Sequence, residues 1–306
     1  MCFFMSCEKE EIEFVGIENI SLENYPRVDG STSSSVLNVM VACKMLGISY
    51  NWYDYLLLGE WWLQPNLNDI SEEDRIVLFE RVKTSQTHGA FMNLIDGEAD
   101  IILTHRTISP DEKDHAETKG VMLIETPIAM DAFVFIVNKN NKVKSLTVEQ
   151  IQQIYTGKIT NWSEVGGNNA DINVFTRPRN SGSEEIFRTL VMNGLEPASF
   201  HEEPINAMAG VFREVRADDA NGICYTFNNY KDMQARVPDS EVPKIAINGI
   251  FPDKKSIQNK TYPFISEVHV AIRSDLDRNS MAYKLYEWLQ SENAKSTITE
   301  CGFISK

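Results

Sequence analysis

The sequence predicts an α/β fold in which strands and helices alternate along the whole chain. Short apolar runs of strand length are followed repeatedly by longer segments whose apolar residues recur with helical spacing. Hydroxyl-rich loops stand at three of the expected helix starts. Alternation of this kind is typical of helices packed on mostly parallel sheets. With 306 residues, the chain is long enough for two domains or one large one.

An aromatic segment interrupts this alternation in the first half of the chain. It spans residues 50–69 and carries Trp52, Trp61 and Trp62. We interpret it as an insertion packed on the surface, and contact with a partner or a sugar is the alternative. The other elements expected in this half are a strand at 25–30, helices at 36–46, 76–82 and 90–96, and strands at 101–103, 121–125 and 132–137.

The second half continues the alternation without a tandem repeat, a coiled coil or a low-complexity tract. The expected elements are helices at 148–155, 181–191 and 280–290, and strand segments at 173–175, 222–227, 244–248 and 268–273.

One loop of the second half combines a fixed cation, two hydroxyls and a helix start. Ser181 is followed three residues later by Glu184, the spacing of a capping box that opens a helix. The first N–H groups of such a helix lack intrahelical partners and bind anions readily, and Gly182 permits close approach. Arg177 offers a planar, bidentate guanidinium to the same anion, and Ser183 offers a second hydroxyl. The alternative is a simple helix cap with Arg177 in a surface salt bridge.

Two loops of the first half repeat this pattern. Gly30 precedes the hydroxyl run at 31–35 and the helix that follows it, and a second hydroxyl-rich loop spans residues 84–89. Both loops therefore present hydroxyls and free N–H groups at a helix start.

The net charge is strongly negative. The chain carries 29 Lys and Arg residues against 44 Asp and Glu residues, a formal charge of −15. This excludes nucleic acid as an expected partner, and it repels anions at long range. Any anion site must therefore rely on short-range donors, because salt screens charges beyond roughly 8–10 Å.

The cysteines give no sign of a disulfide or metal framework. Cys43, Cys224 and Cys301 are widely spaced and lie in apolar surroundings, so we expect buried free thiols. Cys7 follows a small residue near the N-terminus, as in the lipidated cysteine of bacterial lipoproteins. A secretory signal normally has a basic start and a longer apolar stretch, so an ordinary cysteine is the alternative. The sequence has no uninterrupted apolar run of about 18 residues.

Several motifs, taken in order, resemble one known family. They read VDGSTSSSVLNVMVACKMLG, THGAF, GEADIILTHR, DAFVFIVN, LTVEQIQQIYTGKITNWSEVGG and FTRPRNSGSEEIF. Together they are similar to the PstS-like phosphate-binding proteins of bacterial phosphate ABC transporters, which are type II periplasmic binding proteins. The resemblance covers residues 25–306, and its most specific parts are IYTGKITNW and the Arg-x-x-x-Ser-Gly-Ser loop.

The resemblance implies two α/β lobes joined by a hinge of crossing strands, with the ligand in the cleft between them. We expect residues 1–19 to be a leader or lipoprotein-like tail, residues 20–130 plus 263–306 to form lobe 1, and residues 131–262 to form lobe 2. Such lobes close on their ligand by a hinge motion. The residues expected to bind a phosphate or related oxyanion are Thr32, Ser33, Thr87, His105, Arg106, Arg177, Ser181, Gly182 and Ser183.

One departure from the family pattern concerns selectivity. Well-studied members carry an acidic residue shortly after the strand at 101–103, where it accepts the proton of hydrogen phosphate. Here His105 stands at that place, with Arg106 beside it. A neutral His105 would accept that proton, whereas a protonated one would donate and tolerate sulfate. The alternative is that His105 turns away from the ligand, or that both residues lie on a solvated loop.

The resemblance implies a binding protein and not an enzyme. No Gly-x-Ser-x-Gly or His-Glu-x-x-His motif occurs, and no cofactor or metal is expected. We expect a monomer in the periplasm or at the cell surface, with Cys7 as the candidate lipid anchor, that delivers phosphate to an ABC permease in the membrane. The alternative function is a surface lipoprotein of the same fold that binds another ligand, such as an organic phosphate, in sensing or adhesion.

Overall fold

The structure is a computed structural model that describes residues 14–55, 60–200, 204–218 and 221–306. Cys7, the candidate lipidation site, lies outside the described residues. Within them, no helix has the length and apolar character needed to cross a bilayer.

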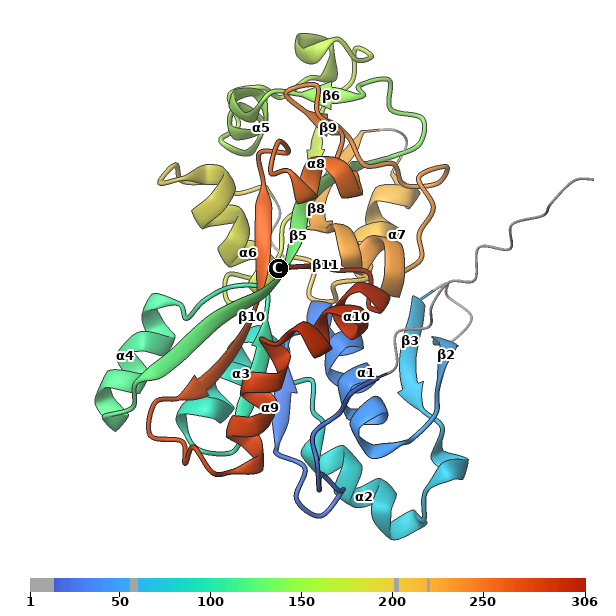
Figure 1. Cartoon of the computed structure of the whole chain (residues 1–306). Coiled ribbons are helices and arrows are strands. Elements are labelled where there is room, and N and C mark those ends of the chain that lie inside the picture. Colours follow the sequence, from blue (N-terminus) through green and yellow to red (C-terminus); the bar gives the residue numbers. More distant parts are fainter. Residues whose placement is uncertain (1–13, 56–59, 201–203, 219–220) are drawn as a thin grey trace, which may run out of the picture.

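A mixed sheet connects the two halves of the molecule (Figure 1). Its strands follow the order β1-β4-β10-β5-β8-β7, and β11 adds to β5. β1 and β7 pair in parallel with β4 and β8, whereas β10 and β5 pair antiparallel with each other and with their outer neighbours. The bounds are β1 Val28–Gly30, β4 Ile101–Thr104, β10 Ile265–Arg273, β5 Leu123–Val137, β8 Gly222–Phe227, β7 Asn173–Val174 and β11 Ile304–Ser305.

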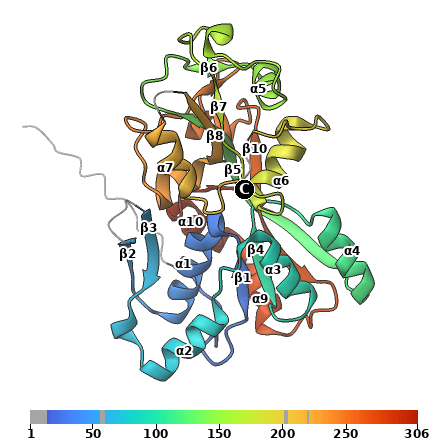
Figure 2. The same cartoon turned by 180° about the vertical axis from the view of Figure 1, so that it is seen from behind.

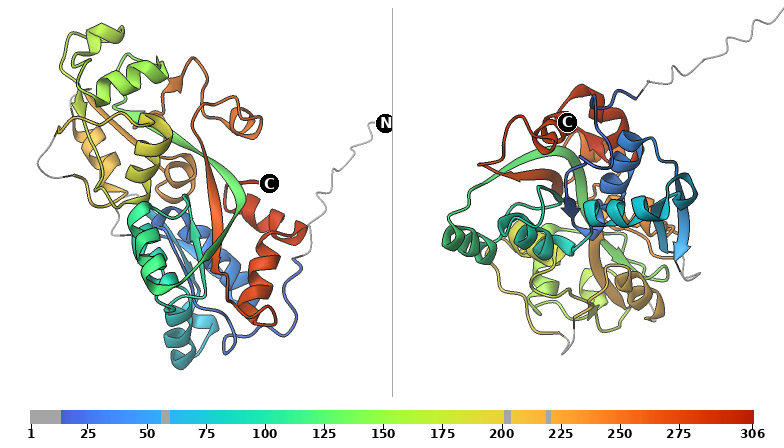
Figure 3. Two further views of the ribbon diagram at one scale, coloured as in Figure 1. Left: turned by 90° about the vertical axis from the view of Figure 1, so that its left-hand side faces the viewer. Right: turned by 90° about the horizontal axis from the view of Figure 1, so that it is seen from below.

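The prediction of mostly parallel sheets is therefore wrong at the centre of the sheet. The prediction of two separate strands at 121–125 and 132–137 is also wrong, because one strand, β5, runs through Pro127 and Asp131. The proline is tolerated where the pairing of β5 with β10 shifts register, between Val268 and His269. β5 and β10 run side by side from one half of the molecule to the other (Figure 3).

The two largest hydrophobic cores give the protein its two-lobed α/β architecture. Buried apolar side chains between residues 130 and 264 form one core, which includes Phe133, Phe135 and Trp162, and the part of the molecule around it is called lobe 2 below. Residues 25–129 and 268–303 supply the other, which includes Leu37 and Trp288, and the part around it is called lobe 1. The fold class expected from the resemblance is confirmed.

The helices cover both lobes, and several begin at the residues that the sequence predicts. Thr147 caps α5 and forms a capping box with Gln150, and Ser280 caps α9. The α-helices are α1 Ser35–Leu46, α2 Glu72–Arg81, α3 Gln86–Ile95, α4 Pro110–Lys119, α5 Val148–Tyr155, α6 Gly182–Ile186, α7 Gly210–Ala217, α8 Lys254–Gln258, α9 Met281–Leu289 and α10 Glu292–Glu300. Three 3-10 segments, η1 Thr32–Ser34, η2 Leu67–Asp69 and η3 Trp162–Val165, and two π-helical segments, η4 Phe187–Met192 and η5 Tyr230–Gln234, complete the described helical elements.

The aromatic segment forms a hairpin at the edge of lobe 1 (Figure 2). Its strands are β2 Tyr50–Tyr55 and β3 Glu60–Pro65, which pair antiparallel. The guanidinium of Arg236, from the other lobe, lies 4.3 Å from the Trp52 ring and 4.8 Å from the Trp61 ring. The hairpin is thus more than a surface insertion, because it reaches across to lobe 2. A further two-stranded sheet joins β6 Ser145–Leu146 to β9 Ala246–Ile247.

The described cysteines are buried free thiols, as expected. Cys43, Cys224 and Cys301 form no disulfide, and burial raises the pKa of each thiol. No cluster of three or more His, Cys, Asp or Glu residues that could hold a metal ion occurs among the described residues.

Candidate anion-binding site

A pocket of about 200 Å³ opens between the two lobes at the helix starts singled out from the sequence. One buried water needs only about 10–15 Å³ by the same kind of measure, so the pocket accepts a ligand of several heavy atoms. Its lining residues are Ser31, Thr32, Ser33, Trp62, Gln86, Thr87, Arg177, Ser181, Gly182, Ser183, Asn206, Ala207, Met208, Ala209, Phe227 and Tyr230.

The first hydroxyl loop connects β1 to η1 and α1. Gly30 is required there, because a Cβ at this position would lie 2.7 Å from the Leu103 carbonyl oxygen. The backbone can therefore pack against β4, and Ser31 donates its N–H to that carbonyl at 3.0 Å. Ser33 is buried, and its hydroxyl lies 3.2 Å from that of Ser31.

Asp29 holds the two loops of lobe 1 in fixed relation. Its carboxylate accepts the N–H groups of Gly30 at 2.7 Å and Ser85 at 2.8 Å. The same carboxylate accepts from the Asn93 side chain at 2.7 Å. The start of α3, with buried Thr87 in its first turn, is thereby fixed beside the first hydroxyl loop.

The third loop comes from lobe 2 and starts α6. Ser181 is the N-cap residue, as predicted, and its hydroxyl accepts the N–H of Glu184 at 3.3 Å. The Glu184 carboxylate does not complete the box, because it binds the Tyr225 hydroxyl and the guanidinium of Arg188. α6 continues into η4, so the helical run extends from Gly182 through residue 192.

Arg177 brings the only guanidinium among the residues that line the described pocket. Its Nη1 donates to the Ile205 carbonyl at 2.6 Å, and its Nε donates to the Ser183 hydroxyl at 3.4 Å. Within the described residues, it forms no ion pair with a carboxylate. Burial lowers the pKa of this guanidinium, although nearby groups such as Tyr225 and Glu184 act in the opposite direction. A half-buried cation that has no carboxylate partner among the described residues favours an anionic ligand.

Contacts across the cleft bring the loops together. Gly182 lies directly against Thr87. A Cβ atom added at Gly182 would lie only 3.1 Å from the Thr87 Cβ. On the other side, the Gln234 side chain donates to the Ser33 carbonyl at 2.9 Å and accepts from the Ser35 hydroxyl at 3.3 Å. Hydroxyls and helix N-termini from both lobes therefore surround one volume together with a guanidinium, an arrangement suited to an oxyanion.

Comparison with known proteins shows the family. Residues 78–293, more than half of the chain, match the sequence pattern of the PBP superfamily domain. The chain belongs to the PBP superfamily. The expected resemblance of this chain to PstS-like proteins is confirmed, because several of its relatives carry the name phosphate-binding protein PstS.

Three relatives illustrate the extent of the similarity. The chain is 26% identical to the phosphate-binding protein PstS of Bacillus subtilis over 209 residues, which is 68% of this chain and 65% of that protein. It is 29% identical to the Staphylococcus epidermidis protein of the same name over 223 residues, or 72% and 67% of the two chains. Protein SphX of Synechococcus elongatus is 26% identical over 234 residues, or 73% and 68%. The aligned region thus spans slightly less than two thirds of the B. subtilis protein.

Solved structures share the fold over nearly the full length. A Clostridium perfringens structure with bound phosphate, provisionally assigned as a phosphate ABC transporter substrate-binding protein, has a TM-score of 0.66 and 24% identity. It covers 94% of this chain and 99% of that chain. An ABC-type phosphate transport receptor from Vibrio cholerae has a TM-score of 0.60 and 24% identity, with 91% and 99% covered.

The pocket brings together seven of the nine predicted ligand residues. Thr32, Ser33 and Thr87 line it from lobe 1, and Arg177 and residues 181–183 line it from lobe 2. His105 and Arg106 are not among its described lining residues.

Both residues are buried, and they line a different cavity of about 440 Å³. Arg106 forms a two-pronged ion pair with Glu112, with both Nη–Oε distances at 2.7 Å, and stacks 5.1 Å from the Phe91 ring. Its charge is therefore already neutralised by a buried carboxylate. His105 contacts Ser33 through Nδ1 at 2.9 Å, so it lies one hydrogen bond away from the pocket.

The sequence interpretation missed two parts of the wall. Trp62 lies in the aromatic hairpin, whose tryptophans were the signal, but nothing in the sequence indicated which one faces the ligand. Asn206 and the residues Ala207, Met208 and Ala209 precede α7, which begins at Gly210. This is a fourth helix start at the pocket, but it lacks the hydroxyls that marked the other three in the sequence.

Proposed function

We propose that this chain is an extracytoplasmic solute-binding protein that holds inorganic phosphate, or a related tetrahedral oxyanion, between its two lobes. The observation that carries the proposal is Arg177, a half-buried cation without a carboxylate partner among the described residues, at a pocket lined by hydroxyls from three helix starts. Relatives named phosphate-binding protein PstS support phosphate as the ligand.

The lobe boundaries and the cellular context belong to the same proposal. The proposed lobe 1 comprises residues 20–130 and 263–306, and the proposed lobe 2 comprises residues 131–262. The two largest hydrophobic cores support this division, because they separate within a few residues of these boundaries. The protein acts as a monomer in the periplasm or at the cell surface, anchored through Cys7. It delivers its ligand to an ABC permease and has no catalytic role.

Titration calorimetry with phosphate, arsenate, sulfate and molybdate tests the proposal. We expect phosphate and arsenate to bind with dissociation constants in the micromolar range or below. A dissociation constant of about 1 μM corresponds to a binding free energy of about −8 kcal/mol. The proposal is wrong if none of the four oxyanions binds below millimolar concentration.

A second candidate ligand is an organic phosphate, and Trp62 is the observation that favours it. The Trp62 side chain, Met208 and Phe227 give the pocket an apolar wall beside its polar loops. Such a wall suits the organic group of a phosphate monoester, because aromatic rings bury apolar surface and stack on planar groups. The aromatic hairpin would then select the ligand in a sensing or adhesion protein of the same fold.

Phenyl phosphate and inorganic phosphate distinguish the two candidates when each is titrated against wild type and Trp62→Ala. If the organic phosphate is the ligand, wild type binds phenyl phosphate more tightly than inorganic phosphate, and the substitution weakens only phenyl phosphate. If inorganic phosphate is the ligand, phenyl phosphate binds no better than inorganic phosphate in either protein.

A further inference from the structure

A buried chain of three side chains leads away from the anion pocket. The Ser33 hydroxyl, at the pocket wall, lies 2.9 Å from Nδ1 of His105. The other ring nitrogen, Nε2, lies 3.3 Å from Oδ2 of Asp131. This second contact has ion-pair distance, although Nε2 makes no well-aligned hydrogen bond to any described group. All three residues are at most 3% exposed.

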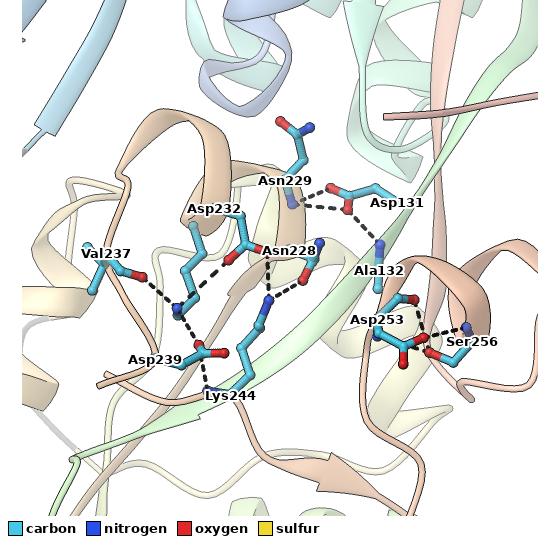
Figure 4. A network of polar contacts seen from close by, with 11 residues as sticks. Asp131, Ala132, Asn228, Asn229, Asp232, Val237, Asp239, Lys244, Asp253 and Ser256 are labelled. Atoms are coloured by element: carbon cyan, nitrogen blue, oxygen red, sulfur yellow. Dashed lines mark hydrogen bonds and ion pairs between the residues drawn. The ribbon is translucent and has the colours of Figure 1, made fainter. Parts of the chain in front are cut away.

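The far end of this chain is fixed by backbone groups. Figure 4 shows the Asp131 carboxylate facing Ala132 and Asn229. It accepts the N–H of Ala132 at 2.8 Å and that of Asn229 at 3.1 and 3.3 Å. Asp131 lies in β5 and Asn229 follows the neighbouring strand β8, so the carboxylate is held between β5 and the end of β8.

The His105 ring is enclosed by aromatic side chains. Its centroid lies 4.3 Å from that of Phe227 and 5.5 Å from that of Phe303. The ring therefore cannot turn to another partner without disturbing the packing of both lobes.

Other charged and titratable groups face His105 from the neighbouring elements. Arg106 follows it in the chain but is bound to Glu112. His269 and Glu267 of β10 and Glu185 of α6 line a cavity of about 440 Å³ that also reaches His105. Asp131 is the carboxylate in direct contact with the ring among the described residues.

The direction of the Ser33 hydroxyl follows from the charge state of the ring. A neutral ring carries its proton on Nε2, where it faces the Asp131 carboxylate, so Nδ1 is an acceptor. Ser33 then donates its O–H to Nδ1 and presents only lone pairs to the pocket. A charged ring donates from Nδ1 instead, so the Ser33 O–H is free to donate to an oxygen of the ligand, with the Ser31 hydroxyl at 3.2 Å as its other acceptor.

We propose that His105, without touching the ligand, sets which oxyanion the pocket accepts by turning the Ser33 hydroxyl. With neutral His105, Ser33 accepts a hydrogen bond and selects an anion that still carries a proton, such as hydrogen phosphate. With charged His105, Ser33 donates and the pocket also accepts a fully ionised anion, such as sulfate. The inference rests on the proposed function, since it assigns selectivity to the same site.

Sulfate is the right probe because it carries no proton near neutral pH, so any proton linkage must come from the protein. We expect the affinity of wild type for sulfate to be about tenfold higher at about pH 5.5 than at about pH 8, because acid favours the charged ring. This is the scale of one hydrogen bond to a charged group, for which about 1.4 kcal/mol corresponds to a factor of ten. Asn at position 105 keeps a polar group near Nδ1 but does not titrate, so His105→Asn should bind sulfate equally at both pH values.

His115→Asn is the matched control. His115 is a surface histidine whose Nε2 lies 3.0 Å from Asp96, far along the chain from the pocket loops. This variant should keep the full pH dependence of wild type. Equal sulfate affinity of wild type at the two pH values, or a dependence that persists in His105→Asn, would overturn the inference.

Proton uptake gives a second measurement that needs only wild type. When sulfate is titrated near pH 7 in buffers of different ionisation enthalpy, the heat should reveal uptake of a fraction of one proton per sulfate bound. Absence of uptake contradicts the inference even if His105→Asn fails to fold. Failure of the proposed function looks different, because then neither phosphate nor sulfate binds at any pH.

Discussion

Gly182 and Thr87 meet across the cleft so closely that a Cβ on Gly182 would overlap with the Thr87 hydroxyl. Gly182 is the first residue of α6 in lobe 2, and Thr87 lies in the first turn of α3 in lobe 1. Two helix starts from different lobes are therefore in contact, which requires the lobes to be closed at this point. The glycine serves this approach, since its φ is not in the left-handed region.

Gly182→Ala should weaken phosphate binding by obstructing closure. Overpacking of this kind costs about 1–3 kcal/mol, or roughly a 5- to 150-fold loss of affinity. Calorimetry measures the loss, and small-angle scattering should show a larger radius of gyration with phosphate present. Thr87→Ala removes the overlapping hydroxyl, so in Gly182→Ala/Thr87→Ala the two losses should be less than additive. Strict additivity would mean that this contact does not limit closure.

Arg177→Ala should be the most damaging single substitution for binding. Removing one partner from a desolvated charged contact costs about 2–5 kcal/mol, so phosphate affinity should fall by roughly 30-fold or more. Arg179→Ala is the matched control, because Arg179 lies two residues along the same loop but is exposed. Ser181→Ala should cost less than Arg177→Ala, since it removes one neutral hydroxyl. If Arg177→Ala and Ser181→Ala both keep phosphate affinity within twofold, the ligand binds elsewhere.

The parts of the site that local sequence determines were predictable. Ser181 caps α6 because a hydroxyl at that spacing satisfies free N–H groups, and α5 begins after Thr147 for the same reason. Such rules operate within one turn of helix, so no knowledge of the rest of the chain is needed. The same holds for the close packing of Gly30, which the sequence marked as a glycine before a hydroxyl run.

Long-range contacts were not predictable in the same way. The family resemblance made Arg106 a candidate ligand, but its partner, Glu112, also caps the helix that begins after Ser109. Two strands were predicted where β5 is continuous. Pro127 cannot donate to a strand ladder, and β10 accommodates it through a change of register that the local sequence does not reveal. The contact of Arg236 with Trp52 joins residues far apart in sequence, and only the fold brings them together.

Arg236→Gln should loosen the closed state without unfolding either lobe. Its guanidinium stacks on Trp52 and Trp61 of the hairpin, and such cation–π contacts contribute about 0.5–2 kcal/mol. We therefore expect phosphate affinity to fall about 2- to 30-fold. Arg236→Lys keeps the cation and should retain part of the affinity.

Arg213→Gln is the control for this prediction, because exposed Arg213 forms its ion pair with the adjacent Glu214. The unfolding temperature of all three variants should stay close to that of wild type. An Arg236→Gln protein with unchanged phosphate affinity would show that the hairpin contact does not contribute to closure.

His269 should make stability depend on pH. It is buried in β10, and no described group accepts from or donates to its Nδ1. Burial lowers the pKa of its imidazole in the folded protein, with nearby Glu267 acting in the opposite direction. The unfolded chain, with a histidine pKa of about 6.5, then binds more protons than the folded protein just below that pH. The free energy of unfolding must therefore fall as the pH drops below about 6.5.

His269→Gln should reduce this loss of stability. One titrating group changes the free energy of unfolding by at most about 1.4 kcal/mol per pH unit, so urea unfolding at about pH 7 and pH 5 is sensitive enough to measure it. The difference between the two pH values should be smaller for the variant than for wild type, whatever the absolute stability of the variant. His115→Gln, which changes a histidine that is not buried, controls for general effects of losing a histidine. If the free energy of unfolding changes equally with pH in wild type and His269→Gln, the imidazole takes up its proton as readily in the folded protein as in the unfolded chain. The cavity that His269 shares with His105 would then be wetter than its burial implies.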